Sequence, residues 1–231
     1  IIASYGQKVL NIKDFNIEGV KDITPIVVEA LEKCKKEGFS TLLFPKGTYH
    51  FYPTFAPEFF CEITNNDNGL KRTSFPLIGF NDFVVDGNGS DFIFHGKMIP
   101  FIIEESTNVK ITNLSIDWEV PFALEGLVVA NDETKHTFDI EVKTPYVVEH
   151  ERLYLSLERE DSPYEQKFGK RFATWEHYNI EVGQNIFWDP KTMAPLYNTS
   201  LYNMPEKGNN ATELKKGLIR ISTKMKALPP I

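Results

Sequence analysis

Two carboxylates lie two positions apart in the stretch SIDWE, which runs from Ser115 to Glu119. On a β-strand, Asp117 and Glu119 would share one face, about 6–7 Å apart along the chain. An inverting glycosidase needs two carboxyl groups about 6.5–9.5 Å apart, one to protonate the leaving oxygen and one to activate a water. The spacing fits that chemistry, but many ordinary strands share it. We therefore favour two other roles for this pair, binding of a sugar or formation of a polar corner.

Trp118 stands between the two carboxylates and would point to the opposite face of a regular strand. An aromatic side chain in that place packs into a core or offers a platform on which a sugar ring stacks. The sequence favours the core and leaves the platform open.

A second polar cluster is the stretch NNDNGLKR at residues 65–72. The planar side chains of Asn66, Asp67 and Asn68 could exchange hydrogen bonds with sugar hydroxyls, because amides both donate and accept. Arg72 could fork onto two hydroxyls. The alternative is a long turn whose polar side chains bond their own backbone, with the glycine at positive φ.

Other chemistries lack their residues. VVDGNGSDF has neither the Gly-Lys-Ser/Thr of a phosphate loop nor the closing glutamate of a calcium loop, and predicts a corner between strands. The five histidines show no zinc-ligand spacing, so we expect no metal and no cofactor. A net charge of −7 disfavours nucleic acid as a partner. Cys34 falls on the apolar face of a predicted helix, which indicates a buried free thiol.

The first residues of the sequence indicate where the protein is located. Residues 1–6, IIASYG, resemble the end of a signal peptide with its small-residue cleavage site, and a first strand is the alternative. We expect an exported protein, periplasmic, cell-surface or extracellular. No stretch is long and apolar enough to span a membrane.

The first elements are a helix and short strands. DITPIVVEALEKCKKEG offers Thr24 as N-cap, proline in the first turn, and Gly38 as the terminating residue. Val27, Ala30, Leu31 and Cys34 then form its buried stripe. Strands follow at 41–44 and from 48, around a Pro-Lys-Gly turn.

Two later segments repeat each other. NDFVVDG, from Asn81, aligns with TNVKITN, from Thr107, and FIF at 92–94 then aligns with LSI at 114–116. Short strands and turns that recur in this way are typical of a parallel β-helix, with a sandwich as the alternative.

The pattern changes near residue 120. His136, Phe138, Ile140 and Val142 alternate with Thr137, Asp139 and Glu141, which predicts a strand with one buried face in an antiparallel hairpin. Strand patterns recur at ERLYLSLERE, NIFWDPKTMAPLY and GLIRIST, while 203–217 is predicted as a polar loop. Antiparallel strands in this number predict a small barrel or sandwich.

The residues also carry a family resemblance. DFNIEGVKDITPIVVEALEKCKKEGFSTLLFPKGTYHF resembles the opening of pectate-lyase-like right-handed β-helix proteins, in which a helix caps the first coil. The chain from NNDNGLKR to EGLVVA resembles glycoside hydrolase family 110, the bacterial α-1,3-galactosidases, whose β-helix is interrupted by β-barrel insertions.

Combined with the patterns at residues 1–6 and near residue 120, the resemblance implies a mainly β fold in three parts: 1–6 as signal-peptide remnant, 7–119 as capping helix and first right-handed β-helix coils, and 120–231 as barrel-like insertion. It implies an exo-acting enzyme that removes terminal α-1,3-linked galactose from glycans with inversion. The family's catalytic aspartates lie on later coils, so we expect this chain to be the N-terminal part, inactive alone, and assign no catalytic residue. Homo-oligomer formation stays open.

Two rival functions remain. A pectin-type lyase or hydrolase acts on acidic polymers and needs a basic cleft, which the net charge of −7 disfavours. A non-catalytic β-helix module that only binds glycan at a surface is the other.

Overall fold

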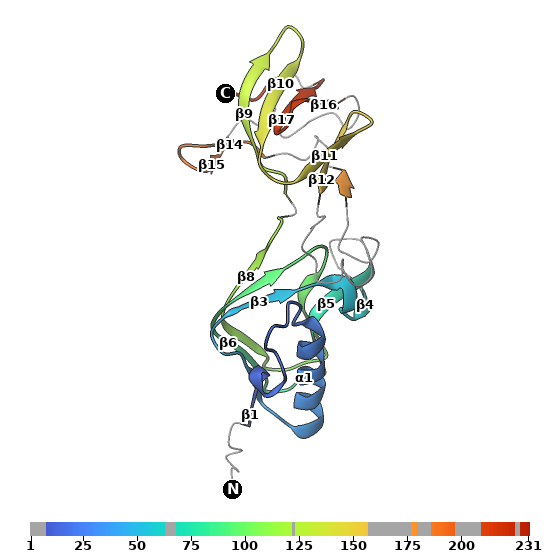
Figure 1. The fold of residues 1–231 in the computed structure, drawn as a ribbon, viewed down its shortest axis with the longest axis vertical. Helices are drawn as coiled ribbons and strands as arrows, with labels where there is room; N and C mark the ends of the chain where they lie inside the picture. The colour runs from blue at the N-terminus through green and yellow to red at the C-terminus, as the bar shows by residue number, and fades with distance from the viewer. Residues whose placement is uncertain are drawn as a thin grey trace. The chain divides into compact units, whose positions relative to one another are not determined.

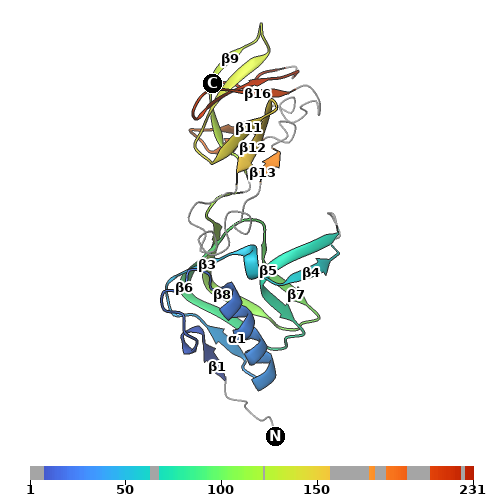
Figure 2. The same cartoon turned by 45° about the vertical axis from the view of Figure 1, so that its right-hand side comes forward.

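The computed structural model describes residues 8–62, 68–121, 123–156, 177–179, 186–196, 209–224 and 227–231. They form two compact units, which divide between Glu119 and Val120. The first contains a single described α-helix, α1, and strands β1 to β8, and the second contains β9 to β17 (Figures 1 and 2). No described helix has the length and apolarity to cross a membrane. The expected mainly β class is confirmed.

Helix α1 (Thr24–Glu37) begins one residue earlier than its sequence predicts. Thr24 is inside the helix, not its N-cap, because the Asp22 carboxylate accepts the Thr24 N–H at 2.9 Å and so supplies the missing partner. At the other end Gly38 adopts φ 70°, the left-handed conformation that glycine allows at least cost.

The predicted stripe of α1 is buried. Val27, Ala30, Leu31 and Cys34 are each at most 2% exposed. Cys34 is a free thiol, as expected, and burial raises its pKa to about 12. This cysteine therefore fills space in the core as a small apolar side chain.

The first unit contains two sheets, and most of their pairs are parallel. β6 pairs in parallel with β2, β3 and β8, β2 pairs in parallel with β1, and in the smaller sheet β5 pairs in parallel with β7 and antiparallel with β4. The strands of this unit are β1 (Val9–Asn11), β2 (Thr41–Leu43), β3 (Thr48–Phe51), β4 (Glu58–Cys61), β5 (Gly69–Ile78), β6 (Val84–Phe94), β7 (Ile99–Glu104) and β8 (Lys110–Trp118); short 3-10 helices are η1 (Ile12–Asp14) and η2 (Pro53–Phe55). The right-handed β-helix stays a prediction.

The first half of the sequence repeat correctly predicts the pairing register of β6 and β8. Asn81 bridges Thr107 and Val84 pairs with Lys110, as the alignment predicts. The second half was misaligned, because Phe92 pairs with Ile116 and not with Leu114. β6 places three residues between its paired segments where β8 places only Asn113, so the offset between the copies changes.

This corner requires small or left-handed residues. A Cβ on Gly87 would lie 2.5 Å from the Leu114 Cβ, so only glycine fits there. Asn88 and Asn113 adopt φ 50° and 55°, a conformation that asparagine tolerates. The Asn113 amide donates to the Asp86 carboxylate at 3.0 Å, which ties the two copies together. These residues form the predicted corner between strands.

Phenylalanine dominates the core of the first unit. Phe44, Phe51, Phe75, Phe92 and Phe94 are all fully buried. Their rings form edge and stacked contacts, such as Phe75 on Phe92 at 5.6 Å and Phe51 on Phe94 at 4.7 Å. Burial of each such side chain stabilises the fold by about 1.5–3 kcal/mol, so this row holds the two sheets in contact.

The second unit is antiparallel throughout its described strands. Its sheets run β16-β17-β10-β9, β11-β12-β13 and β14-β15. The bounds are β9 (Gly126–Asp132), β10 (Thr137–Val142), β11 (Tyr146–Glu149), β12 (Arg152–Ser156), β13 (His177–Asn179), β14 (Trp188–Asp189), β15 (Ala194–Pro195), β16 (Asn210–Lys215) and β17 (Leu218–Ser222).

Two predictions for this unit are wrong. The polar loop at 203–217 contains strand β16, an edge strand whose backbone pairs with β17 and which buries only Ala211, so its polar sequence hides it. His136 is exposed at φ 51° in the turn before β10, and Thr137, which the predicted alternation places on the outer face, is only 8% exposed.

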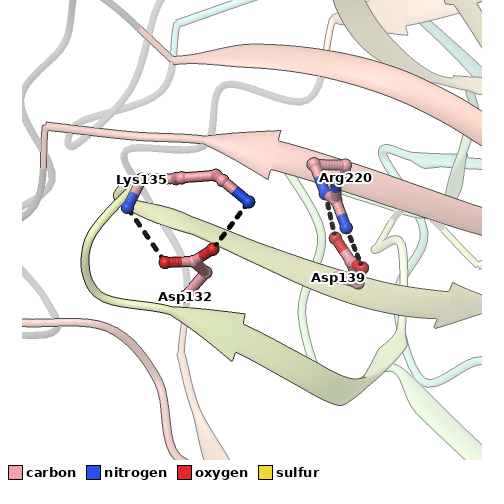
Figure 3. Close-up of polar contacts among 4 residues, drawn as sticks. All are labelled: Asp132, Lys135, Asp139 and Arg220. Carbon is pink, nitrogen blue, oxygen red and sulfur yellow. Dashed lines mark hydrogen bonds and ion pairs between the residues drawn. The ribbon is translucent and has the colours of Figure 1, made fainter.

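Asp139 is the third exception, and it has a partner. The alternation places it on the outer face, but it is only 7% exposed. Arg220 lies directly opposite on β17 and donates to both carboxylate oxygens, at 2.7 and 2.8 Å (Figure 3). A bidentate bond of this kind lets a charge be buried in a strand.

We predict that Asp139→Asn lowers the thermal unfolding midpoint by about 5 °C, since it breaks a bidentate bond at a buried carboxylate. The matched control is Asp132→Asn, because Asp132 pairs with Lys135 at 3.1 Å on an exposed turn beside it (Figure 3). That variant should shift the midpoint by less than about 2 °C. Circular dichroism melts measure both, and equal shifts would contradict the prediction.

Candidate functional site

Three parallel strands end side by side in the first unit. In register, His50 of β3 pairs with Ile93 of β6, which pairs with Asp117 of β8. The next row is Phe51, Phe94 and Trp118. The ladder continues past the strands, because His95 N–H donates to Phe51 O at 2.9 Å and Glu119 N–H donates to Phe94 O at 3.0 Å. The rows fix which side chains meet at this edge.

The row of Phe51, Phe94 and Trp118 faces the core. Phe94 lies 4.7 Å from Phe51 and 5.7 Å from Trp118, measured between ring centroids. Trp118 is half-buried against this cluster. Core packing, the role that the sequence favours, is therefore observed, and stacking on a sugar stays a prediction.

The opposite face holds a histidine pair that sequence reasoning missed. His50 Nδ1 lies 2.9 Å from His95 Nε2. One of these nitrogens must donate and the other accept, so the two rings cannot both be protonated while the bond exists. Forty-five positions separate the two histidines in sequence, and only the register of β3 against β6 brings them together.

Tyr52 completes this group. Its ring stacks on His95 at 3.9 Å between centroids and 3° between planes. Tyr52 is 4% exposed and His95 1% exposed. The Tyr52 backbone N–H donates to Asp22 and to Thr24 Oγ1, which anchors Tyr52 to the start of α1. The pair is thus a rigid, covered support beside the strand ends.

The two predicted carboxylates are exposed at the end of β8. Asp117 Oδ1 accepts the Trp118 N–H at 2.8 Å, which orients the carboxylate without burying it. Glu119 is exposed one position past the strand. Ser115 on the same face donates to Asp91 of β6 at 2.5 Å. At β8 the outer face of this edge is polar and exposed, as sugar binding requires.

The second predicted cluster lies on a different sheet. Asn66 and Asp67 are outside the described residues, whereas Asn68 is described and exposed. Arg72 donates through Nε to Glu58 Oε1 at 2.8 Å, and both side chains are exposed. Gly69 does not adopt the positive φ that the turn alternative requires, because it starts β5 and pairs with Cys61 of β4.

The structure therefore gives two separate groups and not one constellation. The first is the edge formed by β3, β6 and β8, and the second is the exposed hairpin of β4 and β5 (Figure 2). Within the described ranges, no three His, Cys, Asp or Glu side chains are grouped to hold a metal ion. Both groups offer carboxylate, aromatic and amide or guanidinium side chains, the types that bind hydroxyls.

The comparisons with known proteins agree on one family. A model described as GLAA-B beta-barrel domain I matches residues 155–231. Alpha-1,3-galactosidase A of Shewanella woodyi is 31% identical over 97% of this chain and 35% of its own length. Alpha-1,3-galactosidase B of Bacteroides thetaiotaomicron is 33% identical over 93% of this chain and 32% of its own length. Alpha-1,3-galactosidase B of Akkermansia muciniphila is 36% identical over 63% of this chain and 19% of its own length.

The class is thus a mainly β protein whose residues 155–231 are similar to GLAA-B beta-barrel domain I. More particularly, the chain is a relative of the α-1,3-galactosidases, and the resemblance inferred from its sequence is confirmed. It spans about a third of the length of the first two of these relatives.

We predict that Trp118→Ala lowers the free energy of unfolding by about 2 kcal/mol, because it removes a half-buried ring from the Phe94 contact. The control is Ile116→Ala on the same strand, where the side chain is 43% exposed and the cost should stay below about 1 kcal/mol. Urea titrations followed by circular dichroism measure both. Equal losses would show that Trp118 is not a core residue.

Proposed function

We propose that this chain is part of an exo-acting glycoside hydrolase that removes terminal α-1,3-linked galactose from oligosaccharides or glycoconjugates. The single observation that carries the proposal is the similarity to alpha-1,3-galactosidase A over 97% of the chain. A match that runs through both compact units relates the whole chain, and not one common module, to such an enzyme.

The proposal includes a parallel β-helix as the scaffold. Its support is the row of parallel pairs from β2 through β6 to β8, together with the parallel pair of β5 and β7. Asparagines in the left-handed conformation form the corners of both copies. The Asn108 amide donates to the Asp82 carboxylate at 2.6 Å and so joins one copy to the other, as stacked coils require. Helix α1 would cap the first coil.

Galactose recognition is assigned to the two polar groups of the first unit. In this proposal Asn66, Asp67, Asn68 and Arg72 bind hydroxyls from the hairpin side, and Asp117, Trp118 and Glu119 bind from the edge of β8. Arg72 is oriented by Glu58, and Asp117 by the Trp118 backbone, so both present polar atoms in a fixed direction. Fixed side chains lose less entropy on binding.

The proposed chemistry is a single displacement by water. One carboxylic acid protonates the oxygen of the departing glycan while a second carboxylate takes a proton from the attacking water. The water oxygen bonds to the anomeric carbon from the face opposite to the leaving oxygen, so the α-linkage yields β-galactose. We leave both catalytic carboxyls unassigned.

Two further features belong to the proposal. The signal-peptide character of residues 1–6 supports export, which would place the enzyme with extracellular or periplasmic glycans. The net charge of −7 disfavours nucleic acid as a partner, because it repels phosphate. Assembly into homo-oligomers is compatible with this reading and awaits measurement by light scattering.

We predict that the full-length protein containing these residues releases galactose from a trisaccharide that ends in α-1,3-linked galactose. Proton NMR of the first product should show the β-anomer, because a single displacement inverts the linkage. The control substrate is the same trisaccharide with a terminal β-galactose, which should not react. If no α-galactoside is cleaved, the proposed function is wrong, and first release of the α-anomer would refute inversion.

We predict that Asp117→Asn and Glu119→Gln raise KM several-fold and lower kcat by less than tenfold, as expected for sugar-binding groups. A general acid or base would lose about 10²–10⁴ in kcat instead. Steady-state kinetics of galactose release distinguish the two. Asp132→Asn serves as control, since its carboxylate lies on an exposed turn of the second unit.

A further inference from the structure

The hairpin of β4 and β5 presents an unusual outer face. Glu58 pairs with Arg72 and Phe60 pairs with Leu70 across the two strands. Because side chains two apart on a strand share a face, these four point to the same side. All four are exposed, whereas Phe59 and Lys71, which point to the other side, are half-buried.

Phe60 is the most notable of the four. It is 66% exposed, and so is Leu70 opposite it. Because Phe60 and Leu70 are paired across the two strands, their exposed side chains form one contiguous apolar patch, and such a patch with a polar border is a candidate for ligand contact. The sequence pattern pointed to the polar residues 65–72 and not to Phe60.

An ion pair of fixed geometry stands next to this ring. Arg72 Nε donates to Glu58 Oε1 at 2.8 Å, with 44% and 45% of the two side chains exposed. The bond uses one of the five guanidinium donors and one carboxylate oxygen, so other donors and acceptors face outward. This pair lies about 7 Å along the strands from the Phe60 and Leu70 pair, close to the width of a hexose.

We propose that this face is a galactose-binding subsite in which the Phe60 ring stacks on the sugar while Arg72 and Glu58 bind its hydroxyls. The inference rests on the proposed function for the choice of sugar. Because the 4-hydroxyl of galactose is axial, the C–H bonds at C3, C4 and C5 form an apolar patch on the other ring face, and these polarised hydrogens meet the negative face of an aromatic ring favourably. Guanidinium donates to the hydroxyl oxygens and carboxylate accepts their hydrogens.

A second protein copy is a weaker occupant for this face. Phe60 and Leu70 together expose on the order of 250 Å², far below the ~800 Å² that each partner gives to a stable interface. The flanking ion pair also suits a ligand rich in hydroxyls better than an apolar partner surface. The patch therefore matches one sugar ring in size and in chemistry.

The test is a calorimetric titration of the full-length protein with free galactose, which involves no turnover. Phe60→Leu keeps an apolar side chain but removes the ring, and it should raise Kd about tenfold. Phe59→Leu is the matched control, because it changes the same residue type one position away on the other face, and it should leave Kd within twofold. Arg72→Lys should also raise Kd, since Lys lacks the planar fork.

The outcomes are distinct from those of the hydrolysis assay. Equal Kd for wild type and Phe60→Leu, or no measurable binding by wild type, would overturn the subsite even if galactose is released normally. Equal rises for Phe60→Leu and Phe59→Leu would mean that the hairpin is merely destabilised, and would also overturn it. Thermal melts of each variant, expected within about 3 °C of wild type, verify that the hairpin stays folded.

Discussion

The parallel ladder of β6 is the constraint on which the first unit depends. β6 pairs with β2 through its first half, with β3 through its second half, and with β8 along most of its length. A shift of one residue in any of these registers would turn every side chain of the shifted strand to the other face. A shift of β3 against β6 would break the histidine pair, and a shift of β8 would turn its exposed carboxylates toward the core.

What fixes this register is the shape of the corner and the packing beneath it. Gly87 allows the backbone of β6 to approach Leu114 on β8 as no larger residue could. Below it, Phe92 and Phe94 fill the space that Phe44, Phe51 and Phe75 leave, with every one of these rings fully buried. Backbone geometry and volume thus require the same alignment, a consistency that favours one native state.

The same register decides which side chains of β8 pack into the core and which are exposed. Trp118 points to the Phe94 ring, whereas Asp117 before it and Glu119 after it are exposed. A strand that alternates in this way anchors itself through one side chain and offers its neighbours to a ligand. In the second unit, Asp139 breaks the alternation because Arg220 opposite it satisfies the buried carboxylate.

The sequence by itself determined the local elements and the family. Helical spacing located the buried stripe of α1, the repeat from Asn81 and Thr107 gave half of the β6 and β8 register, and quoted motifs led to the α-1,3-galactosidases. Tertiary structure decided what depends on distant partners. His50 meets His95, Asp139 meets Arg220, and polar β16 becomes a strand only through pairing with β17. A local sequence pattern indicates the secondary structure that its residues prefer. Burial, pairing and register depend instead on neighbours that are far away in the sequence.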